Sequence, residues 1–152
     1  PFELSADFLP DLLRERDEPW SARMAARLQT VCPDCVPEVW SVCLNVRDAG
    51  AVHRRLMQAR PVHLGELMLD NVDRSENIPM VALLVERNGK PQLLPPAELA
   101  LMPGDQLLLA GADGARRRFE LTLQNSNVME YVLSGRESGG GWLWQRLSGN
   151  RG

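Results

Sequence analysis

Apolar residues recur at helical spacing in the first part of the chain. Two sets lie three or four positions apart: Phe8, Leu9, Leu12 and Leu13 in the first, and Trp20, Met24, Leu28 and Val31 in the second. Such spacing puts each set on one face of an amphipathic helix. Ser5 can cap the first helix, and Cys32-Pro33 ends the second because proline cannot continue it. The pattern therefore predicts a helical pair within residues 1–37.

Four apolar segments in the middle of the chain have the composition of strands: residues 39–46, 80–85, 92–94 and 106–110. Asn88-Gly89 lies between the second and third segments and is typical of a tight hairpin turn. Pro103-Gly104-Asp105 precedes the fourth segment. Glycine there permits a backbone conformation that a Cβ atom would resist, and Asp105 can accept hydrogen bonds from turn amides. The pattern predicts a hairpin followed by a turn and a further strand.

The remaining segments read as short helices and a tail. Helices are expected at residues 52–57, 64–68 and 113–123, the last with Phe119 and Leu123 inward and Arg116 to Arg118 solvated. The apolar run at residues 128–133 is predicted to be a strand, with a returning strand at Trp142-Leu143-Trp144. The expected fold is α+β. It has a small mixed or antiparallel sheet of about four strands with helices on one face, preceded by the helical pair and followed by a strand-rich tail.

Composition bounds the class of protein. The 152 residues are 44% hydrophobic, enough for one ordinary core. Seventeen basic and 20 acidic residues give a net charge of -3, so there is no electrostatic reason to expect nucleic-acid binding. No apolar run approaches the roughly 20 residues that cross a bilayer, and no signal-peptide pattern opens the chain. Pro1 in place of an initiator Met is expected for a segment of a longer protein, and three cysteines favour reduced thiols in the cytoplasm.

An ordered series of elements resembles a known family. From residue 80 an apolar strand ends in Arg87, Asn88-Gly89 turns the chain, a proline-containing strand follows, and Pro103-Gly104-Asp105 leads into a strand that ends in Gly111. The strand at residues 39–44 and the sequence His63-Leu64-Gly65-Glu66-Leu67 precede this series. Together they resemble the C-terminal subdomain of RCK proteins, the regulators of potassium conductance, also called the TrkA C-terminal domain. The resemblance covers residues 38–111.

The resemblance implies a regulatory domain at residues 38–124, preceded by a helical linker at 1–37 and followed by a C-terminal extension at 125–152. Such a domain would form a homodimer or higher homo-oligomer, contact an upstream nucleotide-binding lobe and a membrane pore of the same parent chain, and bind no nucleic acid. It would control the gating of a potassium channel or cation transporter from the cytoplasmic side of the bacterial inner membrane. No cofactor is expected in this segment, and the sequence does not identify a nucleotide or ion ligand. A pure assembly module that dimerises without a ligand remains an alternative.

The candidate ligand site is the densest basic cluster of the chain: Arg54, Arg55, Arg60, His63 and Arg74. Guanidinium groups suit phosphate, and a solvated helix face is the competing interpretation. No catalytic residue is assigned, because no nucleophile, base and orienting group occur in a recognisable arrangement. An enzyme is therefore not expected.

Cys32-Pro33-Asp34-Cys35 is a C-x-x-C motif. With Cys43 and His53 it could supply four zinc ligands, and by itself it could act as a thiol switch. Structural zinc sites usually pair two close-spaced doublets, and reactive dithiols usually precede a helix, whereas this motif follows one. A module switched by zinc or by thiol chemistry is therefore kept as a second alternative.

Trp142 and Trp144 follow three consecutive glycines near the end of the chain. Tryptophans two residues apart offer a large apolar anchoring area. They are expected to pack either on another part of the full protein or on this domain itself.

Overall fold

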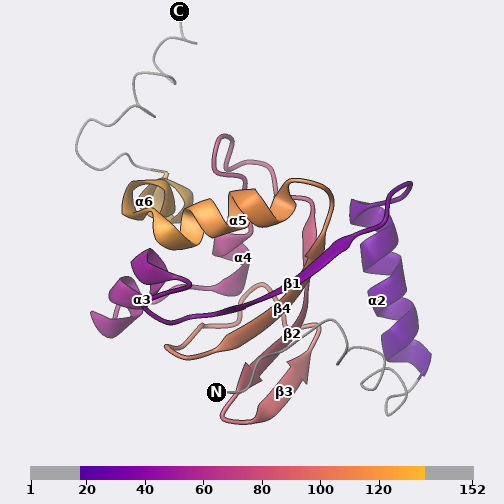
Figure 1. Ribbon diagram of the computed structural model, residues 1–152, viewed down its shortest axis with the longest axis horizontal. Coiled ribbons are helices and arrows are strands. Elements are labelled where there is room, and N and C mark those ends of the chain that lie inside the picture. Colours follow the sequence, from indigo (N-terminus) through magenta and orange to yellow (C-terminus); the bar gives the residue numbers. More distant parts are fainter. Residues whose placement is uncertain (1–17, 136–152) are drawn as a thin grey trace, which may run out of the picture.

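A computed structural model describes residues 18–135, which form a four-stranded antiparallel sheet covered by helices (Figure 1). The strands are β1 (Glu38–Cys43), β2 (Met80–Arg87), β3 (Lys90–Leu93) and β4 (Gln106–Gly111). Their order across the sheet is β1-β4-β2-β3. The α+β class and the four strands predicted between residues 39 and 110 are confirmed.

The two predicted turns hold this sheet in register. At the β2–β3 hairpin, Asn88 and Gly89 have φ of 53° and 76°, the left-handed conformations that a two-residue turn of this kind requires. In the second turn Gly104 has φ of 87°. The Gly104 N–H donates to the carbonyl of Leu44 at 2.9 Å, and the Leu44 N–H donates to the carbonyl of Asp105 at 2.8 Å. The turn before β4 is thereby fixed to the residue that follows β1.

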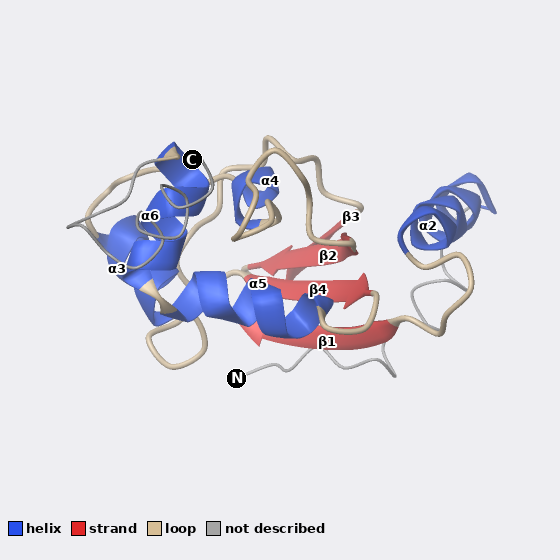
Figure 2. Ribbon diagram, turned by 90° about the horizontal axis from the view of Figure 1, so that it is seen from above, coloured by secondary structure: helices blue, strands red, loops and turns tan. Residues whose placement is uncertain are grey.

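Five helices pack on the two faces of the sheet: α2 (Glu18–Val31), α3 (Gly50–Met57), α4 (Leu64–Leu67), α5 (Ala115–Gln124) and α6 (Ser126–Ser134). Helices α3 to α6 contribute to one buried cluster with one face of the sheet, as expected. Helix α2 packs on the opposite face and stands apart from the other helices (Figure 2). The sheet is therefore the middle layer of three.

The larger core lies between the sheet and α3 to α6. Phe119 of α5 is fully buried, and its ring centroid lies 6.5 Å from that of Trp40 on β1, with the rings tilted by 58°. Leu107 and Leu109 of β4 are also fully buried in this cluster. The inward positions predicted for Phe119 and Leu123 are confirmed.

The smaller core lies between the sheet and α2. Met24 of α2 is buried there, and Leu28 and Val31 pack against it at the predicted helical spacing. A β-bulge in β2 shapes this core: Ala82 pairs with Leu109 and Leu84 with Leu108, so Leu83 has no partner on β4. Strand residues normally alternate between faces, and the extra residue lets Leu83 and Leu84 both join the cluster beneath α2.

The strand predicted at residues 128–133 is wrong, because this segment is helix α6. The Asn125 side chain accepts hydrogen bonds from the backbone N–H groups of Asn127 and Val128 at 3.0 and 3.2 Å, which caps the helix start. Gly135 ends it with φ of 71°. The first predicted helix and the predicted strand at Trp142-Leu143-Trp144 lie outside the described residues.

Between residues 18 and 135, no helix combines the length and the apolar character needed to cross a membrane.

Candidate functional site

A groove lies between the C-terminal half of α2 and the segment around α4. It has a volume of about 1180 Å³, and a smaller hollow of about 300 Å³ adjoins it. Both are bounded by the same five residues: Thr30, Val31, Met68, Met80 and Ala97. We call the two together the α2–α4 groove.

The inner surface of the α2–α4 groove is largely apolar. Ile78 and Met80 are buried beneath it, and the half-buried side chain of Met68 lies beside them. Methionine side chains are flexible and polarisable, so they adapt to occupants of different shape. The groove therefore offers an apolar site with some freedom to adjust.

The rim of the groove is acidic. Glu66, Glu76 and Glu98 line the larger hollow, and Glu76 and Glu98 are exposed. Glu66 also has partners in the fold, since its Oε1 accepts from the His63 N–H at 3.0 Å and lies 2.6 Å from His63 Nδ1. Arg27 is the one basic side chain that lines the adjoining smaller hollow. An apolar floor beneath carboxylates suits an occupant that is both apolar and positively charged.

Four stretches of sequence build the groove: residues 27–31, 63–69, 76–82 and 95–98. Gly65 allows the second and fourth to meet, since its N–H donates to the Ala97 carbonyl at 2.8 Å and a Cβ atom on Gly65 would lie 2.7 Å from that of Ala97. Of the predicted site residues only His63 lies here. Sequence reasoning missed the groove because no single stretch carries its pattern.

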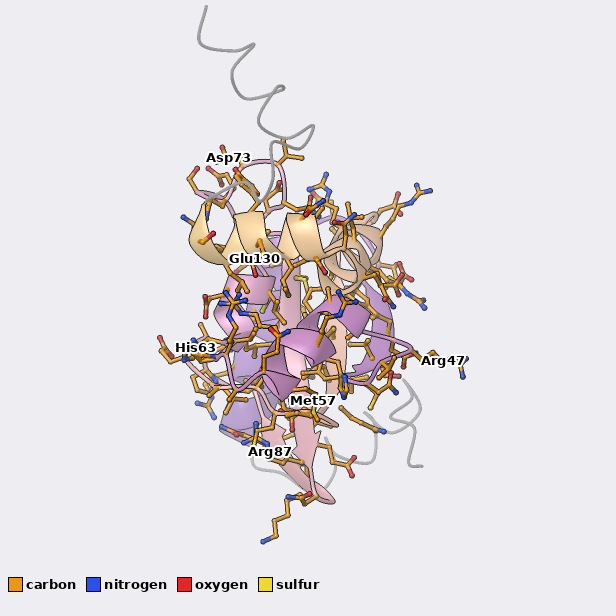
Figure 3. The ribbon with its side chains drawn as sticks, turned by 90° about the vertical axis from the view of Figure 1, so that its left-hand side faces the viewer. Arg47, Met57, His63, Asp73, Arg87 and Glu130 are labelled. Carbon is orange, nitrogen blue, oxygen red and sulfur yellow. A yellow bond between two sulfur atoms is a disulfide. The ribbon has the colours of Figure 1, made fainter. Side chains whose placement is uncertain are left out.

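The structure divides the predicted basic cluster. Arg55 and Arg60 both face Glu130 of α6, with N–O distances of 2.8 and 3.6 Å, while Arg54 donates to the Ser126 hydroxyl at 3.2 Å. Figure 3 shows Glu130 and His63 at separate levels of the molecule. These three arginines therefore bridge α3, and the turn after it, to α6.

Arg74 also contacts α6. Its Nε donates to the Val132 carbonyl at 3.2 Å, near the end of the helix, and the Tyr131 hydroxyl donates to the Val72 carbonyl at 3.1 Å. Four of the five predicted ligand residues thus contact α6, and phosphate binding by them stays a prediction.

Replacing Glu130 by glutamine should lower the free energy of unfolding by about 1–2 kcal/mol, because the half-buried Arg55 loses a charged acceptor. The amide hydrogen-exchange rate should rise first in residues 126–134. Calorimetry measures the change in the free energy of unfolding. The matched control is Glu120→Gln, which breaks the more exposed i,i+4 pair with Arg116 on α5 and should cost only a few tenths of a kcal/mol. Equal effects of the two substitutions would contradict the role given to Glu130.

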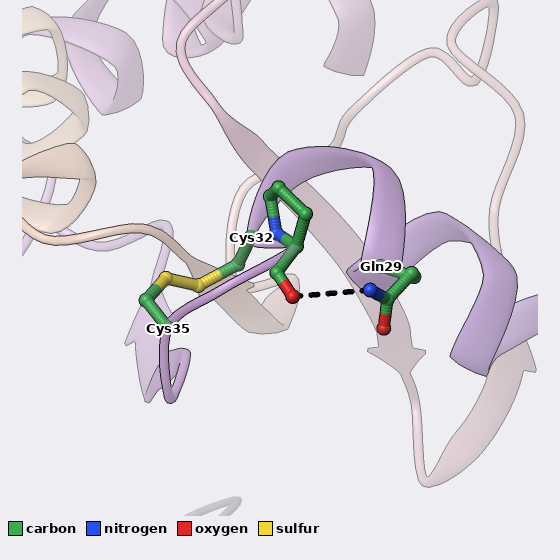
Figure 4. Close-up of a disulfide and its surroundings, with 4 residues drawn as sticks. Gln29, Cys32 and Cys35 are labelled. Atoms are coloured by element: carbon green, nitrogen blue, oxygen red, sulfur yellow. Dashed lines mark hydrogen bonds between the residues drawn. A yellow bond between two sulfur atoms is a disulfide. The ribbon is translucent and has the colours of Figure 1, made fainter.

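The structure joins Cys32 and Cys35 in a disulfide, so the expectation of reduced thiols is wrong for this pair (Figure 4). The C-x-x-C spacing places the two Cα atoms 5.3 Å apart, within the range that a disulfide requires. Gln29 Nε2 also donates to the Pro33 carbonyl at 3.1 Å. Both contacts fix the turn between α2 and β1, next to the groove wall at Thr30 and Val31.

The described residues give the zinc alternative no support, and it stays a prediction. Among residues 18–135 no three His, Cys, Asp or Glu side chains come close enough to hold a metal ion. Cys35 lies before β1 and Cys43 ends it, so about six strand residues, or about 20 Å, separate them. A thiol switch at Cys32 and Cys35 stays a prediction.

Cys43 is the free cysteine of the described chain. Burial raises the pKa of its thiol above the ordinary value, and the Asp48 carboxylate adds to the shift. Because the thiolate is the nucleophile, iodoacetamide should modify Cys43 more slowly at pH 8 than it modifies the unfolded chain. The pH midpoint of the rate should move down in Asp48→Asn. A midpoint at or below that of an ordinary thiol would contradict this account.

A charge pair with a buried carboxylate lies at the Pro-Gly-Asp turn. Asp105 is 1% exposed and accepts from Arg87 Nε at 2.9 Å, Arg87 Nη2 at 2.8 Å and the Met102 N–H at 2.9 Å. Arg87 Nη2 also donates to the Ala100 carbonyl at 2.9 Å. This network joins the hairpin to the turn, and its role is structural.

The sequence matches no known family model, and no curated protein is significantly similar to it.

Proposed function

We propose that this chain is a regulatory domain of a potassium channel or cation transporter, which dimerises and changes state when the α2–α4 groove is occupied. The observation that carries the proposal is the position of the groove between α2 and the rest of the domain. An occupant that contacts both Val31 and Met68 touches α2 and the segment after α4, which pack on the sheet independently of each other. Its binding energy can therefore favour one position of α2 over another.

Helix α2 is held in a way that suits such a shift. Among the side chains described for residues 21–31, it adds the buried Met24 and the half-buried Leu28 and Val31 to the smaller core. Helices α3 to α6 instead share a cluster of twenty buried residues with the sheet. A ligand moves an equilibrium only by its difference in affinity for the two states. Such a difference is easiest to generate where one wall of the site has few contacts of its own.

The transport role rests on the sequence resemblance to the RCK C-terminal subdomain. The order β1, two short helices, the β2–β3 hairpin, the Pro-Gly-Asp turn and β4 agrees with the pattern on which that resemblance stands. The domain then precedes or follows a pore in its parent chain, and α2 is the element that leads toward the upstream lobe. Dimerisation is proposed on the same ground.

The test is a thermal-shift screen of the full chain, with potassium, magnesium and calcium chlorides, adenine nucleotides, cyclic dinucleotides and benzyltrimethylammonium as probes. A ligand that binds only the native state raises the unfolding midpoint as its concentration exceeds its dissociation constant. We expect a saturable rise with a cation. The rise should be lost in Ala97→Trp, which fills the groove, and retained in Glu86→Lys, six residues along β2 from Met80.

The competing outcomes are separable. A dimer whose midpoint responds to none of the probes would support a pure assembly module and contradict the groove as a sensor. A rise with a nucleotide that survives in Ala97→Trp would place the ligand elsewhere, with the basic residues near α6 as the first candidates. Sedimentation equilibrium measures the mass, and a monomer at all concentrations would contradict dimerisation.

A further inference from the structure

We infer that the α2–α4 groove is an internal docking site for the chain's own C-terminal segment, with Trp142, Leu143 and Trp144 seated on its apolar floor. The inference deepens the proposed function, since it names an occupant that external ligands would have to displace. Its physical basis is independent of that function. It rests on where the described chain ends, on the chemistry of the groove and on the charge of the segment.

The described chain ends beside the groove rim. Helix α6 finishes at Ser134 and Gly135, where Arg74 donates to the carbonyl of Val132 at 3.2 Å. Leu69, which lines the groove, packs against the buried cluster of Val128, Tyr131 and Val132 on α6. Residues 136–142 can span up to about 24 Å when extended. A segment of that length is long enough to lead from the end of α6 past Leu69 into the groove without any change in the described fold.

The segment and the groove match in chemistry. Residues 142–147 hold Trp142, Leu143, Trp144 and Leu147 in a region otherwise made of glycine, serine and charged or amide side chains. Tryptophan buries a large area at the cost of few rotatable bonds and typically anchors contacts in apolar pockets. The floor formed by Met68, Ile78 and Met80 is such a surface, and the groove of about 1180 Å³ is as large as sites that enclose sizeable ligands.

Charge selects this segment over the other end of the chain. Residues 136–152 carry three Arg and one Glu, a net side-chain charge of +2 (3 − 1). Residues 1–17 carry two Arg and five Asp or Glu, a net charge of -3 (2 − 5). Carboxylates of Glu66, Glu76 and Glu98 line the groove, so they attract the first segment and repel the second. The apolar N-terminal residues are therefore the poorer match.

The test uses the full chain with p-benzoylphenylalanine in place of Trp142. Benzophenone reacts readily with methionine, so irradiation should link position 142 to Met68 or Met80 within one chain, as mapped by mass spectrometry of peptides. Mixing unlabelled and nitrogen-15 chains shows whether a link joins two copies. The Glu76→Lys/Glu98→Lys variant should reduce the yield about fivefold, because it removes two exposed attractive charges and introduces repulsion. Glu86→Lys, on the same strand as Met80 but far along it, should leave the yield unchanged.

Each other outcome overturns the inference. Links confined to mixed pairs of labelled and unlabelled chains would assign the segment to a second copy. Links to residues outside the groove, no links, or a yield that ignores the charge reversals would remove the segment from this site. The two proposals can fail separately. Links to Met68 in a chain that binds none of the screened probes keep this inference and contradict the sensor, and a cation response without links does the reverse.

Discussion

Replacing Phe119 by alanine should lower the free energy of unfolding by about 4 kcal/mol, the largest effect expected for a single substitution in this domain. The ring is fully buried and lies against Trp40, so its removal loses apolar burial and leaves a cavity between α5 and β1. At about 2–4 °C per kcal/mol for a chain of this size, the unfolding midpoint should fall by about 8–16 °C. Differential scanning calorimetry measures both quantities.

The matched control is Leu121→Ala on the same helix. Leu121 is 44% exposed, so the change tests helix propensity and surface burial without opening the core. It should cost well under 1 kcal/mol. A Phe119→Ala protein as stable as Leu121→Ala would mean that α5 does not pack on β1 as described.

Replacing Asp105 by asparagine should cost about 3 kcal/mol even though the side chain keeps its size. Asp105 accepts three hydrogen bonds with two carboxylate oxygens, two of them from the Arg87 guanidinium. Asparagine has one acceptor oxygen, and the N–H groups of its amide would face other N–H donors. Arg87 would then remain partly buried without its counter-charge, which is the costly way to break an ion pair. Urea unfolding gives the free energy.

A double-mutant cycle with Arg87→Met separates the pair from its surroundings. Once Arg87 is methionine, Asp105→Asn should cost clearly less than it does in the parent chain, because no guanidinium remains unpaired. Asp34→Asn is the control for loss of one negative charge, since Asp34 is exposed on the turn after α2. Additive costs in the cycle would contradict direct coupling between Arg87 and Asp105.

The elements that the sequence predicted well are those whose signal is local. Asn88-Gly89 and Pro103-Gly104-Asp105 specify their turns within two or three residues, and the positive φ values of Asn88, Gly89 and Gly104 are what those residues adopt most easily. Met24, Leu28 and Val31 mark a helical face by spacing alone. For such segments the fold adds packing partners without changing the local conformation.

The elements that the sequence did not predict depend on a single helix cap or on partners far away in the chain. Residues 128–133 are a short apolar run that fits a strand as well as a buried helix, and the Asn125 cap decides the outcome. Arg55 looked available for a ligand because its partner, Glu130, lies 75 residues away. The groove is assembled from four separate stretches, so no pattern along the chain could show it.

The bulge at Leu83 has a consequence beyond the smaller core. Before the bulge, the even-numbered residues Met80 and Ala82 face α3 to α6. After it, the odd-numbered Val85 faces them, so the bulge shifts the alternation of the strand by one residue. Arg87 lies two residues after Val85 and so faces the same side of the sheet. Only with this shift does it reach Asp105, which precedes β4. Deleting the residue at position 83 would turn the side chains in the outer half of the hairpin to the opposite face of the sheet. A one-residue deletion would then break the charged network and remove a leucine from beneath α2 together, which makes the length of β2 a more constrained property than the identity of any residue in it.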